Sequence, residues 1–155
     1  MKNSRGFIEL YTVNDYWKKL EFDFANLTKN KDDVYLAFNF FVTAYHLIDW
    51  VFQGRYSNDR AKLNSKPILR LCNHIASGIK HFAVDSQRHK SVREIKKNRY
   101  FEKGYIEEGY IESPIIIYLE DELKSEFGES IAIIDLAKKV MHFWKDELTI
   151  RNLIQ

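Results

Sequence analysis

The stretch FNFFVTAYHLIDWVF, residues 38–52, is the most apolar part of the chain, and it decides the fold. Its apolar residues would cover nearly all sides of a helix, so we predict a central, buried helix over residues 32–53. Asp32 and Asp33 favour the start of this helix through its dipole, and Gly54 ends it. The stretch also carries four polar residues that need partners if they are buried: Asn39, Thr43, His46 and Asp49.

Helical spacing of apolar residues predicts three more helices around this one. They cover residues 14–28, Pro67 to about Phe82, and residues 130–152. Asn14 and Ser65 are the predicted N-caps of the first and the third helix in chain order. Residues 54–66, GRYSNDRAKLNSK, are expected to form a polar loop.

Residues 92–119 are rich in Val, Ile, Tyr and Phe, with Gly and Pro between them, which is typical of short strands. We predict an antiparallel sheet of about three strands, which includes the near-repeat KGYIEEGYIE at residues 103–112. The predicted fold is therefore α+β and mainly helical. About four helices form a bundle-like core, the small sheet lies between the third and the last helix, and residues 1–155 form a single domain.

The composition narrows the function classes. A net charge of only +2 means that any nucleic-acid surface must come from local clustering of basic residues. The one cysteine, Cys72, excludes an internal disulfide and a cysteine-based zinc site, and its place on an apolar stripe favours packing over reactivity. Because we see no signal peptide, and because His46 and Asp49 interrupt the longest apolar stretch, we expect a cytoplasmic protein without a membrane partner.

Two polar stripes point to a candidate site. Helical spacing places four residues of the third predicted helix on one face: Arg70, His74, Ser77 and His81. Asn73 and Lys80 lie beside this face. The central helix has a similar stripe, made of Asn39, Thr43, His46 and Trp50, with Asp49 close to His46. If the two helices pack side by side, these stripes share one cleft.

The residue types in this cleft suit acid–base chemistry on a phosphate group. His46 and His81 are the candidate acid and base, and Asp49 orients one of them, since a carboxylate fixes the tautomer of an imidazole and raises its basicity. Lys80 would stabilise developing negative charge, and Arg70 would hold phosphate. The alternative is that an Asp–His or Asp–Lys pair only holds the two helices in register.

A basic run, RHKSVREIKKNR at residues 88–99, follows the third predicted helix and precedes Tyr100 and Phe101. Basic residues beside aromatic ones can hold a phosphate backbone and stack on bases. Arg93, Lys97 and Arg99 would share one face of a strand. The candidate substrate-binding residues are thus Arg88, Lys90, Arg93, Lys96, Lys97 and Arg99, together with Arg70, Asn73, His74 and Ser77. The alternative is a solvated hairpin face that the acidic segments after it balance.

Neither a metal nor another cofactor is expected. A metal site built from His46, Asp49, His74 and His81 is chemically allowed, but their spacing matches no established ligand pattern. The chain also has no G-x-x-x-x-G-K-[ST], G-x-G-x-x-G or G-x-S-x-G motif.

The segments FNFFVTAYHLIDWVF and LCNHIASGIKHF, with the Gly- and Tyr-rich hairpin and a last helix ending near FW, resemble a group of short, uncharacterised bacterial and phage proteins. The matching positions are His46, Asp49, Trp50, Lys80 and His81, whereas Ser77 stands where that group has Asn. The resemblance carries no established activity.

The chain also resembles, more loosely, the HEPN group of helical ribonucleases, which act in toxin and phage-defence systems. Those enzymes cut RNA without a metal, using an Arg and a His separated by four to six residues. Here only three residues separate Arg70 from His74, and the hairpin before the last helix is atypical. The resemblance therefore implies a helical core with polar residues between helices, and it does not transfer the nuclease motif.

From these features we expect a protein that binds or cleaves RNA or another phosphorylated ligand, in a toxin or phage-defence setting. If it is an enzyme, metal-independent phosphodiester cleavage is the expected reaction. The alternative is a non-enzymatic interaction module such as an antitoxin, an anti-defence protein or a complex subunit. Candidate partners are RNA, a phosphorylated small molecule, a partner protein, and a second copy of the chain in a homodimer.

Overall fold

The computed structural model describes residues 6–81, 92–97 and 114–154, apart from the side chains of residues 79–81 and 121. The fold is α+β and mainly helical, as predicted. Its four long helices are α1 (Val13–Lys29), α2 (Val34–Val51), α4 (Pro67–His81) and α6 (Ile133–Ile150). Two short helices, α3 (Asn58–Asn64) and α5 (Asp121–Phe127), and three strands, β1 (Val92–Lys97), β2 (Ile115–Leu119) and β3 (Ser130–Ala132), complete the described part.

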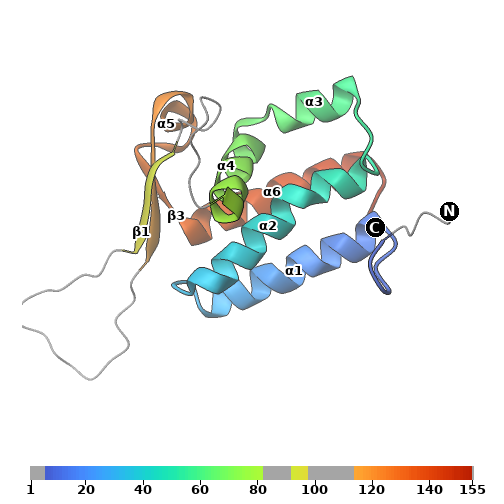
Figure 1. Ribbon diagram of the computed structural model, residues 1–155, viewed down its shortest axis with the longest axis horizontal. Helices are drawn as coiled ribbons and strands as arrows, with labels where there is room; N and C mark the ends of the chain where they lie inside the picture. The colour runs from blue at the N-terminus through green and yellow to red at the C-terminus, as the bar shows by residue number, and fades with distance from the viewer. Residues whose placement is uncertain (1–5, 82–91, 98–113, 155) are drawn as a thin grey trace, which may run out of the picture.

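Helix α2 is the centre of the helical body, since it packs against α1, α4 and α6. Figure 1 shows α1 and α2 as an antiparallel pair, with α6 behind α2. The indole Nε1 of Trp144 on α6 donates to the carbonyl of Ala44 on α2 at 3.0 Å, a buried hydrogen bond that joins the two helices. By length and composition α2 is the one described helix that could cross a membrane, but here its role is that of a core helix.

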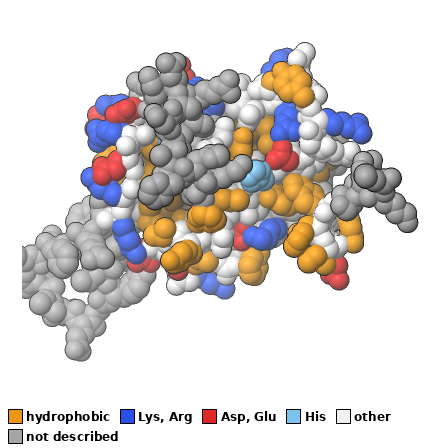
Figure 2. Space-filling view, viewed as in Figure 1, with side chains coloured by type: hydrophobic (Ala, Val, Ile, Leu, Met, Phe, Trp, Pro, Cys, Tyr) orange, Lys and Arg blue, Asp and Glu red, His pale blue; other side chains and the backbone are white. Residues whose placement is uncertain are grey.

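One face of α2 is not buried, which differs from the prediction. Tyr35, Phe38, Asn39 and His46 lie on its exposed side, while Phe40, Phe41, Ala44, Leu47 and Ile48 enter the core. The segment therefore contains more apolar side chains than the core buries. The aromatic side chains that are not buried are exposed to solvent, and Figure 2 shows hydrophobic patches on this side of the molecule.

Helices α1 and α2 begin at side chains that cap them. Thr12, and not the predicted Asn14, is the N-cap of α1: its hydroxyl accepts from the backbone N–H of Asp15 at 3.1 Å, and the Asp15 carboxylate accepts from the backbone N–H of Thr12 at 2.9 Å. The Asp33 carboxylate caps α2 by accepting from the N–H groups of Tyr35 and Leu36. Cap chemistry thus sets both starts within two residues of the predicted ones.

The predicted loop at residues 54–66 contains helix α3. Ser57 caps this helix by accepting from the backbone N–H of Arg60 at 3.0 Å, and Leu63 is buried in the core. A helix of seven residues has one apolar anchor and leaves almost no periodic pattern, so sequence analysis missed it. Figure 1 shows that α3 lies at the end of the helical body away from the sheet.

The sheet is antiparallel with the strand order β1-β2-β3. The side chains of Ile115, Ile117, Leu119 and Ile131 are buried, and β2 and β3 pack against α6. The number of strands was predicted, but β3 comes from residues 130–132, which were expected to begin the last helix. The near-repeat at residues 103–112 lies outside the described residues.

Candidate functional site

The predicted pair of His46 and Asp49 is present on α2. The imidazole Nδ1 lies 3.0 Å from Oδ2 of Asp49, one helical turn away. The two side chains are 49% and 41% exposed, so the pair lies at the surface and not in the apolar interior where we expected it. In Figure 2 a histidine is visible on this face, next to acidic and basic side chains.

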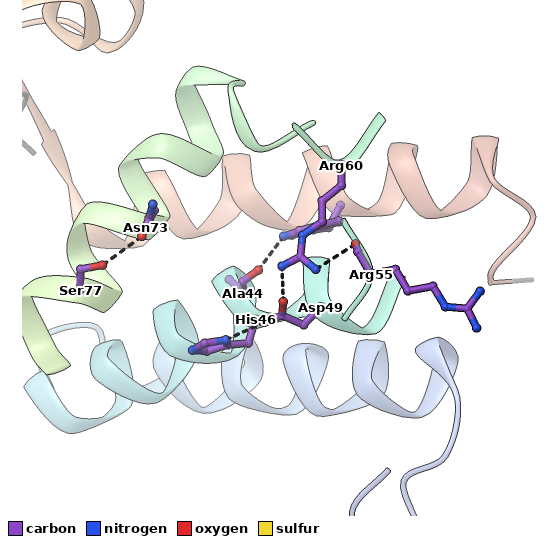
Figure 3. Close-up of polar contacts among 8 residues, drawn as sticks. Ala44, His46, Asp49, Arg55, Arg60, Asn73 and Ser77 are labelled. Carbon is purple, nitrogen blue, oxygen red and sulfur yellow. Dashed lines mark hydrogen bonds and ion pairs between the residues drawn. The ribbon is translucent and has the colours of Figure 1, made fainter. Parts of the chain in front are cut away.

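Arg60 on α3 completes the cluster. Its guanidinium forms an ion pair with Oδ1 of Asp49, and it also donates to the backbone carbonyl of Arg55 at 3.3 Å. Figure 3 shows the Arg60 side chain reaching from α3 to Asp49, with His46 on the other side of the carboxylate. Sequence analysis expected Lys80 or His81 as the cross-helix partner of Asp49, and Arg60 holds that place among the described side chains.

This arrangement determines what His46 can do. Asp49 is a hydrogen-bond acceptor when ionised, so it favours the tautomer in which Nδ1 carries the proton. The Nε2 atom then has a free lone pair on a half-exposed ring. It can accept a proton from a ligand, and it can return the proton once the ring is charged.

Among the described residues the buried carboxylate is that of Asp23 on α1, which sequence analysis did not single out. Asp23 is only 5% exposed; it forms an ion pair with Lys19 and accepts a hydrogen bond from the Thr43 hydroxyl at 2.6 Å. Thr43 therefore faces α1, and not the polar stripe of α4 as predicted. The position of Asp23 on the apolar stripe of α1, between Leu20 and Leu27, is the sequence signal that could have identified it.

Tyr16 lies over this part of α1 and α2. Its ring stacks on Trp50 with 4.7 Å between centroids. Burial raises the pKa of Tyr16 to about 12, and the carboxylates of Asp23 and Asp49 add to the effect. The hydroxyl is therefore neutral at physiological pH and acts as part of the support for the site.

The described polar residues of α4 have partners of their own. Arg70 forms an ion pair with Glu122 on α5, and the Ser77 hydroxyl donates to the side-chain oxygen of Asn73 at 3.0 Å. His74 lines an apolar groove between α2, α4 and β1. The side chains of Lys80 and His81 lie outside the described part, so the shared cleft stays a prediction.

The basic run is only partly described. Arg93 and Lys96 lie over the ring of Tyr118, at 5.5 and 4.9 Å from its centroid, and Lys97 forms an ion pair with Asp32 at 3.7 Å. The prediction that Arg93 and Lys97 share a strand face is wrong, because the pairing register shifts between Val92 and Glu94. The remaining predicted residues Arg88, Lys90 and Arg99 lie outside the described part.

A second basic surface surrounds α3, in the segment that was expected to be only a polar loop. Residues 54–66 contain four cations, Arg55, Arg60, Lys62 and Lys66, against one acid, Asp59. Arg55, Lys62 and Lys66 are exposed and form no ion pair with a described residue, and Tyr56 is 83% exposed beside them. A simple charge count over these residues would have found this surface.

Neither thiol nor metal chemistry is indicated by the described residues. Cys72 is fully buried, and burial raises the pKa of its thiol, which agrees with a packing role. The described residues contain no group of three or more His, Cys, Asp or Glu side chains that could hold a metal ion. A second exposed His–Asp pair is present on α6, where Nε2 of His142 lies 3.5 Å from Asp146.

Comparison with known proteins adds no relative, since no family, no curated protein and no solved structure matches the chain.

Proposed function

We propose that this protein binds RNA and cleaves it without a metal ion, with His46 as the acid–base group. The observation that carries the proposal is the contact of His46 Nδ1 with Asp49 at 3.0 Å on a half-exposed ring. This contact favours a free Nε2 lone pair on the solvent side, which is the form of histidine that a general base needs.

The proposed reaction is an internal transfer within RNA. His46 Nε2 takes the proton of a ribose 2′-hydroxyl, and the 2′-oxygen forms a bond to phosphorus while the bond from phosphorus to the 5′-oxygen breaks. A second proton donor protonates the leaving 5′-oxygen; His81 stays the predicted candidate for this role, and Lys80 the predicted phosphate ligand. The products are a 2′,3′-cyclic phosphate and a free 5′-hydroxyl.

Arg60 would stabilise the phosphate in this reaction. Its guanidinium has five N–H donors, and the contacts with Asp49 and with the Arg55 carbonyl use only part of them. The remaining donors suit a phosphate oxygen next to His46. Asp49 would therefore hold both the base and the phosphate ligand in place, which explains why an exposed carboxylate has two partners.

The proposal is tested by incubating labelled single-stranded RNA with the protein in EDTA. We expect cleavage that His46→Ala reduces at least a hundredfold, since general acid–base catalysis contributes about 10²–10⁴-fold. His142→Ala is the matched control, because it removes an exposed histidine that also lies beside an aspartate. Cleavage that both variants lose equally, or that neither variant changes, would show that His46 is not the base.

A non-enzymatic interaction module is the second candidate, and the exposed N-terminal aromatic residues favour it. Phe7, Ile8 and Tyr11 are each about two-thirds exposed or more, in a tight turn closed by hydrogen bonds between Phe7 and Leu10. Apolar side chains clustered at the surface are typical of protein contacts. Under this alternative RNA is not cleaved, and replacing Phe7 and Tyr11 by Ser abolishes binding of a protein partner.

A further inference from the structure

A shallow hollow of about 320 Å³ lies against α3, outside the site predicted from the sequence. Its walls are Tyr56, Arg60, Ala61, Asn64 and Ser65. Arg60 belongs both to this hollow and to the His46–Asp49 cluster, since its guanidinium contacts Asp49. A molecule in the hollow would therefore lie next to the proposed acid–base group.

The walls of the hollow combine a flat apolar surface with polar groups. The Tyr56 ring is 83% exposed, more than any other large apolar or aromatic side chain in the described part of the chain. Asn64 and Ser65 bring an amide and a hydroxyl, and Ser65 donates to the carbonyl of Lys62 at 2.7 Å, which leaves its oxygen as an acceptor.

The Asn64 amide has a hydrogen-bonding capacity that the fold does not use. Its Oδ1 atom is buried and has no hydrogen-bond partner among the described residues. An unsatisfied buried acceptor costs free energy, and an N–H donor of a ligand in the hollow that reaches Oδ1 would remove this cost. The edges of nucleobases carry such donors next to acceptors.

The charge around the hollow selects an anionic ligand. Arg60 lines it, and two exposed cations, Arg55 before α3 and Lys62 on α3, have no ion-pair partner among the described residues. None of the described residues that line the hollow carries a carboxylate. A metal cation or a basic peptide would therefore be repelled, while a planar ring that carries a phosphate group meets an aromatic face and a guanidinium.

We propose that this hollow binds one nucleobase, stacked on Tyr56, with the attached phosphate on Arg60. The inference rests on the proposed function for its choice of RNA and for the role of Arg60 as a phosphate ligand, and it adds Tyr56, to which the cleavage reaction assigns no role. The same chemistry is present in a free nucleotide and in a nucleotide within single-stranded RNA. A stacked base next to Arg60 would place the adjoining phosphodiester at His46.

The experiment measures the binding of a short, fluorescein-labelled single-stranded RNA by anisotropy at low salt. Tyr56→Ala should raise Kd about tenfold, which is about 1.4 kcal/mol, because it removes the stacking surface. Tyr56→Phe should stay within about twofold, because it keeps the ring. Tyr35→Ala is the matched control, since Tyr35 is 81% exposed on α2 outside the hollow, and it should bind as the wild type does.

Competition with the four ribonucleoside monophosphates identifies the source of the base. Displacement of the RNA by a monophosphate, lost in Tyr56→Ala, supports a nucleotide site; displacement only by unlabelled RNA supports a site for one base within a strand. The inference is overturned if Tyr56→Ala binds like the wild type, if Tyr35→Ala weakens binding equally, or if neither RNA nor nucleotides bind.

The outcome separates the two proposals. Binding that depends on Tyr56, without cleavage in EDTA, keeps the base site and removes the acid–base role of His46. Cleavage that depends on His46, with a KM that Tyr56→Ala does not change, keeps the reaction and removes the base site.

Discussion

Two buried polar contacts join helices in the described part of this protein. Thr43 on α2 donates to Asp23 on α1, and Trp144 on α6 donates to the carbonyl of Ala44 on α2. Because water does not reach these groups, each bond compensates for the desolvation of both its partners. These contacts hold the helices in register, whereas the pair of His46 and Asp49 is exposed, as the proposed acid–base role requires.

Removing the Thr43 hydroxyl should therefore destabilise the fold. Thr43→Val keeps the shape of the side chain but leaves the Asp23 carboxylate with Lys19 as its remaining partner among the described residues. We expect the free energy of unfolding to fall by about 1–3 kcal/mol in urea titrations. Thr28→Val is the control, since the exposed Thr28 hydroxyl only donates to the carbonyl of Phe24 in its own helix. Equal loss in the two variants would contradict the role of the buried pair.

The raised pKa of Tyr16 predicts how the free energy of unfolding depends on pH. Its pKa is raised from 10.0 to about 12 in the folded chain, so the folded state keeps the proton to higher pH than the unfolded state. This contribution to stability is complete below about pH 10 and is lost as the pH rises toward 12. Between about pH 9 and pH 11 the wild type should lose up to about 1 kcal/mol more unfolding free energy than Tyr16→Phe. Tyr11→Phe, at an exposed tyrosine, should follow the wild type.

For single residues, sequence analysis predicted a contact within one helix and missed contacts between helices. The His46–Asp49 pair follows from their spacing of three residues, which a helix converts into proximity. Arg60 and Asp23 were missed because Asp49 and Thr43, which they contact, lie on another helix, and the packing angle and rotation of a helix are not visible in its own periodicity. The missed partners decide which carboxylate is buried and which is exposed.

Contacts at the start of helix α3 and along its inner face fix its position. At its start, Arg151 at the end of α6 contacts both carboxylate oxygens of Asp59, at 2.7 and 3.2 Å, which lowers the pKa of Asp59. Along its inner face, Leu63 enters the core and Arg60 reaches Asp49. The segment that carries the candidate phosphate ligand is thus fixed by side chains from α2 and α6.

The turn between α2 and α3 has the hydrogen bonds of a Schellman motif. The N–H of Gly54 donates to the carbonyl of Asp49 at 2.8 Å, and the N–H of Gln53 donates to that of Trp50 at 3.3 Å. Gln53 has a φ of 51°, in the left-handed region where a side chain meets steric crowding. Predicting Gly54 as the end of the helix was close, but the left-handed position begins one residue earlier.

Replacing Gln53 by glycine should stabilise the protein. Glycine adopts the left-handed conformation without a steric penalty, and it is the residue most common at this position of a helix end. We expect the free energy of unfolding to rise by about 0.5–1 kcal/mol, measured by urea unfolding. Gln53→Ala, which keeps the Cβ atom, should give no gain. A loss of stability in Gln53→Gly would show that the glutamine side chain makes a contribution larger than the backbone strain.

The sheet shows why strands can be predicted although the residues that form each strand are not all predicted correctly. Segments rich in Val, Ile, Tyr and Phe predicted strands before α5, and β1 and β2 are there. Strand β3, with the residues Ser130, Ile131 and Ala132, is too short to show a period, and its sequence continues directly into the helical pattern of α6. Only pairing with β2 makes it a strand, which is a tertiary effect.

Across the whole molecule, the two basic surfaces lie at opposite ends. Figure 1 shows β1 in the sheet at one end of the helical body and α3 at the other end. The described cations of β1 lie over Tyr118 or pair with Glu94 and Asp32, whereas several cations around α3 have no such partner among the described residues. For the proposed RNA binding, this arrangement therefore favours α3 over the run at residues 88–99 as the surface next to His46.

The measurement that tests the central claim most directly is the chemistry of the product ends. Single-stranded RNA is incubated in EDTA with the wild type, His46→Ala and His142→Ala, beside the same RNA with a 2′-deoxyribose at each cleavage position. The account predicts fragments ending in a 2′,3′-cyclic phosphate for the wild type and His142→Ala. It predicts at least a hundredfold less product with His46→Ala, and none from the deoxy-substituted strand. Intact RNA with the wild type, or cyclic-phosphate ends formed equally well by His46→Ala, would contradict it.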